Sequence, residues 1–195
     1  MKSVASLILS ILLSTSAYAE VEVYDLDIKG AHASIQFRIK HLGFSWLFGR
    51  FNKLEGWISG DQSVPSSSKV EVSIDTASID TNHAERDKHL RSADFLNVKK
   101  YPHAKFVSTR VVDNGDKTGT IYGNLSLHGV TKEIKIDAKY VGHGADPWGG
   151  YRAGFEGTTT LKLADFGITY NLGPASTYVE MMLFIEGVRR SEKTH

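Results

Sequence analysis

Residues 32–41 read HASIQFRIKH, and this stretch decides the fold class because its hydrophobic side chains stand at every second position. Ala33, Ile35, Phe37 and Ile39 alternate with serine, glutamine, arginine and lysine. Successive side chains of a β-strand point to opposite faces of the sheet, so one face meets an apolar interior and the other meets water. The stretch therefore predicts a half-buried strand rather than a surface helix.

The same period of two recurs along the chain, and turn signals separate the runs. Asp113-Asn114-Gly115-Asp116 is a strong hairpin signal, and His128-Gly129-Val130-Thr131 predicts a second tight connection. Short connections join antiparallel strands, and such a sheet closes into a barrel or folds into a sandwich because open edges are a liability. We expect eight or nine strands, roughly at 22–28, 32–42, 47–59, 69–75, 104–112, 118–128, 132–141, 151–164 and 178–189.

One segment breaks the strand pattern and predicts a short helix. From residue 81 the chain reads TNHAERDKHL, where Thr81 or Asn82 can cap the first turn. Glu85 follows Asn82 by three positions, as in a capping box. We expect the helix to end near Ser92 and the whole helical excursion to occupy 82–97.

The N-terminus has the pattern of a secretory signal peptide. Lys2 precedes an apolar run from Val4 to Leu13, and Ala17-Tyr18-Ala19 fits the small-x-small cleavage rule. The run is too short to cross a bilayer, which needs about 20 residues. We therefore expect a cleaved leader at 1–19, a single domain at 20–195 and a periplasmic location.

Composition excludes several classes of function. The chain has 195 residues, no cysteine, 23 basic and 22 acidic residues, and Lys2 is the only charged residue of the leader. Equal numbers of the two charges beyond the leader give no support to a nucleic-acid partner. The absence of cysteine excludes disulfides, thiol catalysis and cysteine-ligated metals.

The sharpest candidate for chemistry is the histidine- and acid-rich segment at the helix start. His83 and Asp87 are four residues apart, as are Glu85 and His89, so each pair can meet on one helix face. Two residues turn a helix by about 200°, so the two pairs point away from each other and one ion cannot easily gather all four. A capped, salt-bridged surface turn is the favoured interpretation, with no metal site and no catalytic residue assigned.

Aromatic residues dominate what remains. Phe37, Phe44, Trp46, Phe48 and Phe51 lie within fifteen residues of one another. They fill a solid core in a sandwich, whereas an eight-stranded barrel is wide enough inside for side chains or one small ligand. An apolar lining without an acid–base constellation favours a hydrophobic guest, but composition does not choose between a filled and a hollow interior.

Several stretches of the chain resemble the YceI family of exported lipocalin-like proteins. The stretch 86–91, RDKHLR, is the most specific of them. The matching segments are 41–49, 80–97, 101–102, 127–131, 146–150, 152–156 and 172–176.

The resemblance implies an all-β fold, an extended eight-stranded antiparallel lipocalin-like barrel with the helical excursion between two strands. It implies an apolar tunnel for one long-chain polyisoprenoid, such as a polyprenyl phosphate, a polyprenylphenol or a ubiquinone-like lipid, bound by a carrier or sequestering protein. It implies no enzymatic reaction and no cofactor beyond that lipid. Transient membrane contact and a monomeric or homodimeric state are both compatible with it.

Strand parity, rather than the family motifs, assigns the residues of the tunnel. We expect one parity of each strand to line it, while Phe44, Trp46, Leu90 and Phe95 shape an end and Arg86, His89 or Arg91 faces the head group. The expected lining residues are Ile35, Phe37, Ile39, Val72, Ile74, Phe106, Leu125, Leu127, Ile136, Phe155, Leu161, Met181 and Leu183.

Two other functions stay open at this point. One is a hydrolase or other enzyme on a lipid-like substrate that uses the His83/Glu85/His89 cluster, with His41 as a further suspect. The other is a solid-cored protein that binds partners on its surface. Prenyl chain length, head group and a transport or storage role are not encoded in any motif.

Overall fold

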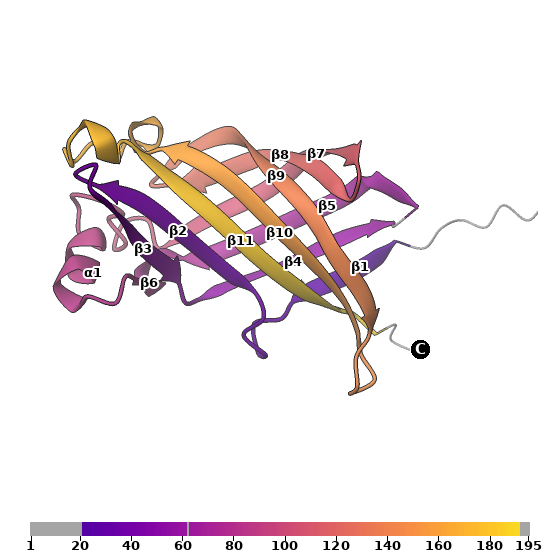
Figure 1. Ribbon diagram of the computed structural model, residues 1–195. Coiled ribbons are helices and arrows are strands. Elements are labelled where there is room, and N and C mark those ends of the chain that lie inside the picture. Colours follow the sequence, from indigo (N-terminus) through magenta and orange to yellow (C-terminus); the bar gives the residue numbers. More distant parts are fainter. Residues whose placement is uncertain (1–20, 62, 192–195) are drawn as a thin grey trace, which may run out of the picture.

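Eight antiparallel strands form a closed barrel in the computed structural model, which describes residues 21–61 and 63–191 (Figure 1). Strand β1 pairs with β4 on one side and with β11 on the other, so the sheet closes on itself. The predicted eight-stranded antiparallel barrel is therefore confirmed. Its strands are β1 (Glu22–Leu26), β4 (Leu54–Asp61), β5 (Val64–Asp75), β7 (His103–Gly115), β8 (Thr118–Leu127), β9 (Val130–Ala145), β10 (Tyr151–Lys162) and β11 (Tyr178–Arg189).

Three further strands continue the wall at one end of the barrel. They are β2 (Ser34–His41), β3 (Ser45–Phe51) and the short β6 (Ile79–Asp80), in the order β11–β2–β3–β6. The expectation of one strand at 47–59 was wrong, because the chain bends at residues 52 and 53. The bend is required because β3 pairs with β2, whereas β4 pairs with β1.

The two tight turns between β7, β8 and β9 are formed by residues with positive φ. At the β8–β9 connection His128 and Gly129 have φ of 51° and 79°, as a two-residue hairpin turn requires. The β7–β8 turn lies two residues later than the Asp-Asn-Gly signal suggests, at Asp116 and Lys117, whose φ values are 50° and 62°. A register shift between Asp113 and Gly115 absorbs the asparagine and lengthens the hairpin.

The helical excursion contains α1 (Ala84–Leu90) and a series of turns after it. The helix cap differs from the expectation, because His83 is the N-cap residue and its Nδ1 accepts a hydrogen bond from the Arg86 N–H. The Thr81 hydroxyl and N–H instead donate to the buried carboxylate of Asp87. This buried contact ties the loop before the helix to the helix itself.

The excursion and two C-terminal turns close one end of the barrel. Figure 1 shows α1 beside β3 and β6 at the left, and the β7–β8 hairpin far from it at the right. Short 3₁₀ turns are η1 (Thr76–Ser78), η2 (Leu163–Phe166) and η3 (Pro174–Ser176). We call the buried cluster at the helix end the plug; it consists of Phe37, Ile79, Phe95, Leu96 and Ile168.

A second apolar cluster lies in the barrel wall and includes Leu26, Ala33, Ile35 and Val72. Within residues 21–61 and 63–191, no helix has both the length and the apolar character that spanning a membrane would need. The predicted leader at 1–19 lies outside the described residues.

Candidate ligand cavity

An elongated cavity of about 510 Å³ occupies the barrel between the plug and the opposite end. Alternation along each strand explains its lining: on β10, Phe155, Gly157, Thr159 and Leu161 line it, while Thr158 between them is exposed. The volume falls within the range usual for ligand pockets, about 300–1,000 Å³. The interior therefore has room for a guest and is not filled by side chains.

Ten of the seventeen residues predicted to bind a lipid lie on the lining of this cavity. They share the inward parity of their strands in the open part of the barrel. They are Ile35, Val72, Ile74, Phe106, Leu125, Ile136, Phe155, Leu161, Met181 and Leu183.

The other seven lie outside the cavity, at the plugged end. Phe37 and Phe95 are buried in the plug, and Leu90 and Leu127 pack against it. The inward faces of these strands are therefore covered by loops and by the helix rather than facing an open interior. Ile39 lies in the same part of the wall, opposite Leu47 and Val179.

Phe44 and Trp46 do not shape the end of the cavity. Phe44 sits in the β2–β3 turn with 89% of its surface exposed. Trp46 is opposite Lys40 on the outer face, and the cationic groups of Arg38 and Lys40 lie 4.2 and 4.1 Å from its ring centroid. Both side chains are therefore directed away from the interior.

Further lining residues could have been found by extending the strand parity. The period of β9 continues from Ile134 and Ile136 to Ala138 and Tyr140, all of which line the cavity. Strand β9 runs to Ala145, beyond the expected end at residue 141. The other apolar or small lining residues absent from the prediction include Tyr24, Leu26, Ile58, Val70, Val111, Ile121, Ala153, Gly157 and Ile185.

Polar side chains gather at the open end of the cavity, which we call the mouth. Asp61 comes from the end of β4, Asp113 from β7, and Asp116 and Lys117 from the β7–β8 turn. The β7–β8 hairpin, which carries three of these residues, lies at the end of the barrel opposite α1 (Figure 1). The cavity is thus apolar along its length and polar at one end.

Tyr140 and His143 form a polar pair on the lining near the mouth. The Tyr140 hydroxyl is in close hydrogen-bonding contact with His143 Nδ1. The Tyr140 ring also lies 5.6 Å from that of Phe155, and the His143 ring lies 5.6 Å from that of Tyr151, centroid to centroid. Partial burial, and to a smaller extent the nearby Tyr151, raises the pKa of Tyr140, which keeps its hydroxyl protonated in neutral solution.

The predicted head-group residues lie away from the cavity, around α1. Arg86 donates to the hydroxyl and carbonyl oxygens of Thr81, both at 2.8 Å. His89 pairs with Asp94 at 3.0 Å and packs edge-on against Phe95. These two side chains therefore stabilise the helix and the segments beside it, and they do not lie at the mouth.

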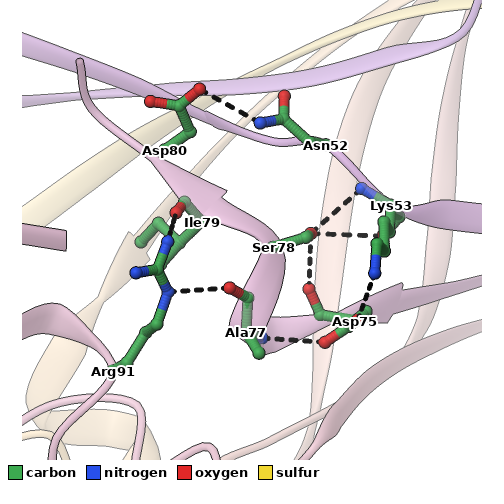
Figure 2. A pocket seen from close by; sticks show the side chains of 8 residues that line it. All are labelled: Asn52, Lys53, Asp75, Ala77, Ser78, Ile79, Asp80 and Arg91. Atoms are coloured by element: carbon green, nitrogen blue, oxygen red, sulfur yellow. Dashed lines mark hydrogen bonds and ion pairs between the residues drawn. The ribbon is translucent and has the colours of Figure 1, made fainter. Parts of the chain in front are cut away.

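Arg91, the third of them, lines a separate polar pocket of about 340 Å³ on the outer surface (Figure 2). Its guanidinium donates to the carbonyl oxygens of Ala77 and Ile79, at 2.7 and 2.6 Å. On the other side of the pocket, Asn52 donates to Asp80 at 3.0 Å. The polar groups of this pocket form hydrogen bonds with one another. These hydrogen bonds connect the β3–β4 bend, the β6 segment and the end of the helix.

The His83, Glu85, Asp87 and His89 set does not converge. Asp87 accepts from Thr81, His83 caps the helix, and His89 faces Asp94. Among the described residues, the one grouping of three metal-ligand side chains is elsewhere, at Asp27, His32 and Glu186.

The carboxylates of that grouping are already paired with the guanidinium of Arg152. The Arg152 guanidinium contacts Asp27 at 2.6 Å, Glu186, and Asp146 at 2.7 Å. A hydrogen bond from His32, followed by those from Arg152, lowers the pKa of Asp27 to about 2. We call this group the clasp, since it ties the β1–β2 loop to β10 and β11.

Comparison with known proteins adds to this geometry. The YceI-like domain profile matches residues 24–187. The chain is similar to a UPF0312 protein of Pseudomonas aeruginosa, with 58% identity over 189 residues, 97% of this chain and 98% of the relative.

Two solved structures share the fold. The YCEI protein of Campylobacter jejuni matches 78% of this chain and 91% of its own, with 28% identity and a TM-score of 0.71. A domain from Saccharophagus degradans, described as polyisoprenoid binding, covers 86% of this chain and 98% of its own, with 17% identity and a TM-score of 0.62. The last likeness, at so low an identity, concerns the fold alone.

Proposed function

Because the chain belongs to the YceI-like domain family, we propose that it binds a long-chain polyisoprenoid lipid in the barrel cavity, as a carrier or sequestering protein. The single observation that carries this proposal is the elongated apolar cavity, closed by the plug at one end and polar at the other. The candidate ligands are a polyprenyl phosphate, a polyprenylphenol and a ubiquinone-like lipid.

The shape of the cavity fits a chain-like guest. Its lining on β9 extends from Ile134 to His143, about 30 Å of strand at about 3.3 Å per residue. Each buried CH₂-sized unit contributes about 0.8 kcal/mol, so a prenyl tail supplies affinity without specific hydrogen bonds. An apolar tail in the barrel and a polar head at the mouth match this division of the lining.

The Saccharophagus degradans domain, which shares this fold, is described as polyisoprenoid binding, and the proposal names the same class of ligand. The family and its structural neighbours point to a binding fold rather than a catalytic one. The enzyme hypothesis rested on the cluster at His83, Glu85 and His89, and these residues are not on the cavity lining. The proposed role is therefore binding, with no cofactor other than the lipid.

A periplasmic location belongs to the same proposal. It rests on the leader pattern of residues 1–19. An exported carrier would shield an insoluble tail from the aqueous space that it crosses.

Extraction of the protein with organic solvent tests this proposal. The protein would be purified from the periplasm without detergent, offered ubiquinone, extracted and examined by lipid mass spectrometry. We expect a prenyl lipid in near-equal amount to the protein. Its absence, both before and after ubiquinone is offered, would refute the binding of a polyisoprenoid.

A further inference from the structure

The charged side chains at the mouth are mostly acidic. Asp61, Asp113 and Asp116 contribute three carboxylates, whereas Lys117 contributes one ammonium group. None of these four takes part in an ion pair within the described part of the chain. An anionic head group at this end would therefore meet an excess of like charge, which raises the free energy of its bound state.

The Tyr140–His143 pair offers hydrogen bonds to a head group without charge. If the Tyr140 hydroxyl donates to His143 Nδ1, the neutral imidazole carries its proton on Nε2. That N–H can donate to a carbonyl oxygen, and the lone pairs of the tyrosine oxygen can accept from a hydroxyl. A quinone, a phenol or a prenol supplies one or both of these partners.

The position of the pair suits a head rather than a tail. The Tyr140 ring packs at a tilt against Phe155, which lines the apolar part of the cavity, and His143 is an exposed residue on the same strand. The pair thus stands where the apolar lining gives way to the polar mouth. A ligand whose tail fills the barrel would bring its first polar atoms to this level.

We infer that the mouth selects polyisoprenoids with a neutral, oxygen-bearing head group, through Tyr140 and His143, and disfavours prenyl phosphates through its three aspartates. The inference rests on the proposed function and adds to it the class of head group. It also moves the expected head-group contact from Arg86, His89 and Arg91 to the opposite end of the barrel.

Competition among ligands with identical tails tests the inference. The full mature chain would be incubated with an equimolar mixture of geranylgeraniol, geranylgeranyl phosphate and a ubiquinone with the same four-unit tail. After removal of free lipid, the bound fraction would be extracted and quantified by mass spectrometry. We expect the bound quinone to exceed the bound phosphate by about ten-fold. This ratio corresponds to a difference in binding free energy of about 1.4 kcal/mol.

Two variants connect the preference to named residues. Tyr140→Phe removes the hydroxyl and keeps the ring, so the bound quinone-to-phosphate ratio should fall about five-fold, the size expected for one hydrogen bond. Asp113→Asn with Asp116→Asn should raise the bound share of the phosphate. Tyr178→Phe is the matched control, because Tyr178 is exposed on β11 and is not on the lining, and it should leave all ratios unchanged.

The outcomes separate this inference from the proposed function. Equal uptake of all three ligands, or a preference for the phosphate, would overturn the head-group inference and leave the binding of polyisoprenoids standing. Unchanged ratios in Tyr140→Phe would also overturn the assigned role of that residue. Failure of the wild-type chain to take up any of the three ligands would overturn both.

Discussion

Thr158 and Thr159 are neighbours on β10 whose side chains lie on opposite sides of the barrel wall. Thr159 lines the cavity opposite Met181, whereas Thr158 is exposed opposite Met182. The two threonines therefore provide a matched pair of positions, identical in residue type and strand, that differ only in the side of the wall.

Thr159→Trp should weaken lipid binding, because the indole would occupy space that the tail needs. Displacement of about three carbons costs about 2.4 kcal/mol, which weakens binding about 50-fold. Thr158→Trp places the same ring outside and should bind as the wild type does. The affinity for a prenyl quinone, measured by titration, checks this prediction, and equal affinities in the two variants would contradict it.

Phe95→Ala should remove much of the plug. Phe95 is 5% exposed and packs against His89 and Tyr170, so its truncation leaves a cavity and should lower the free energy of unfolding by about 3–5 kcal/mol. Phe44→Ala is the control, because Phe44 is 89% exposed and its loss should change that free energy by less than about 0.5 kcal/mol. Urea unfolding measures both; similar losses would show that the plug is not a packed core.

Arg91→Ala should lower stability and leave lipid binding unchanged. The guanidinium satisfies the carbonyl oxygens of Ala77 and Ile79, and its removal should cost about 1–3 kcal/mol (Figure 2). Lys53→Ala in the same pocket removes an exposed group 4.0 Å from Asp75 and should cost less than about 0.5 kcal/mol. A loss of prenyl-lipid affinity in Arg91→Ala, with the fold intact, would assign Arg91 a head-group role after all.

The clasp should make the free energy of unfolding depend on pH in the acidic range. Hydrogen bonds from His32 and Arg152 lower the folded-state pKa of Asp27 from the ordinary 3.8 to about 2. A lowered carboxyl pKa stabilises the fold at pH values above 3.8, and this contribution is lost as the pH falls through about 2. We expect Asp27 to contribute about 1–2 kcal/mol at neutral pH.

Comparison of the wild type with Asp27→Asn isolates this contribution from that of other carboxyls. The difference in unfolding free energy between the two proteins should be smaller at pH 2.5 than at pH 6, because the contribution of Asp27 is only partly lost above its folded-state pKa of about 2. A constant difference between the two proteins across that interval would contradict the assignment of the pH dependence to Asp27.

The strand period predicted the barrel and the side of the wall on which each residue lies. Ile35, Phe155 and Leu183 line the cavity because inward parity in the open part of a barrel leaves them facing the interior. These predictions needed only alternation, which is a local property of a strand.

Parity does not say what lies opposite an inward side chain. Phe37 has inward parity, yet it packs with Phe95 and Ile168, which come from segments distant in sequence. The break between β3 and β4 has the same origin, since it depends on which strands the two halves pair with. Such features are set by tertiary contacts that a local pattern does not contain.

The mouth residues were missed for a related reason. The expected end of β9 at residue 141 left His143 in a loop, whereas the strand continues to Ala145. The helix-end arginines were attractive as head-group ligands because of their charge, but their partners are backbone oxygens of the closed end.

The most direct test of the central claim is native mass spectrometry of the intact mature protein and of Thr159→Trp, each purified without detergent and offered a prenyl quinone. The proposed function predicts one added quinone mass on the wild-type chain and the unliganded mass for Thr159→Trp. A wild-type chain that stays unliganded, or a Thr159→Trp chain that carries the same added mass, would contradict the assignment of the barrel cavity as the lipid site.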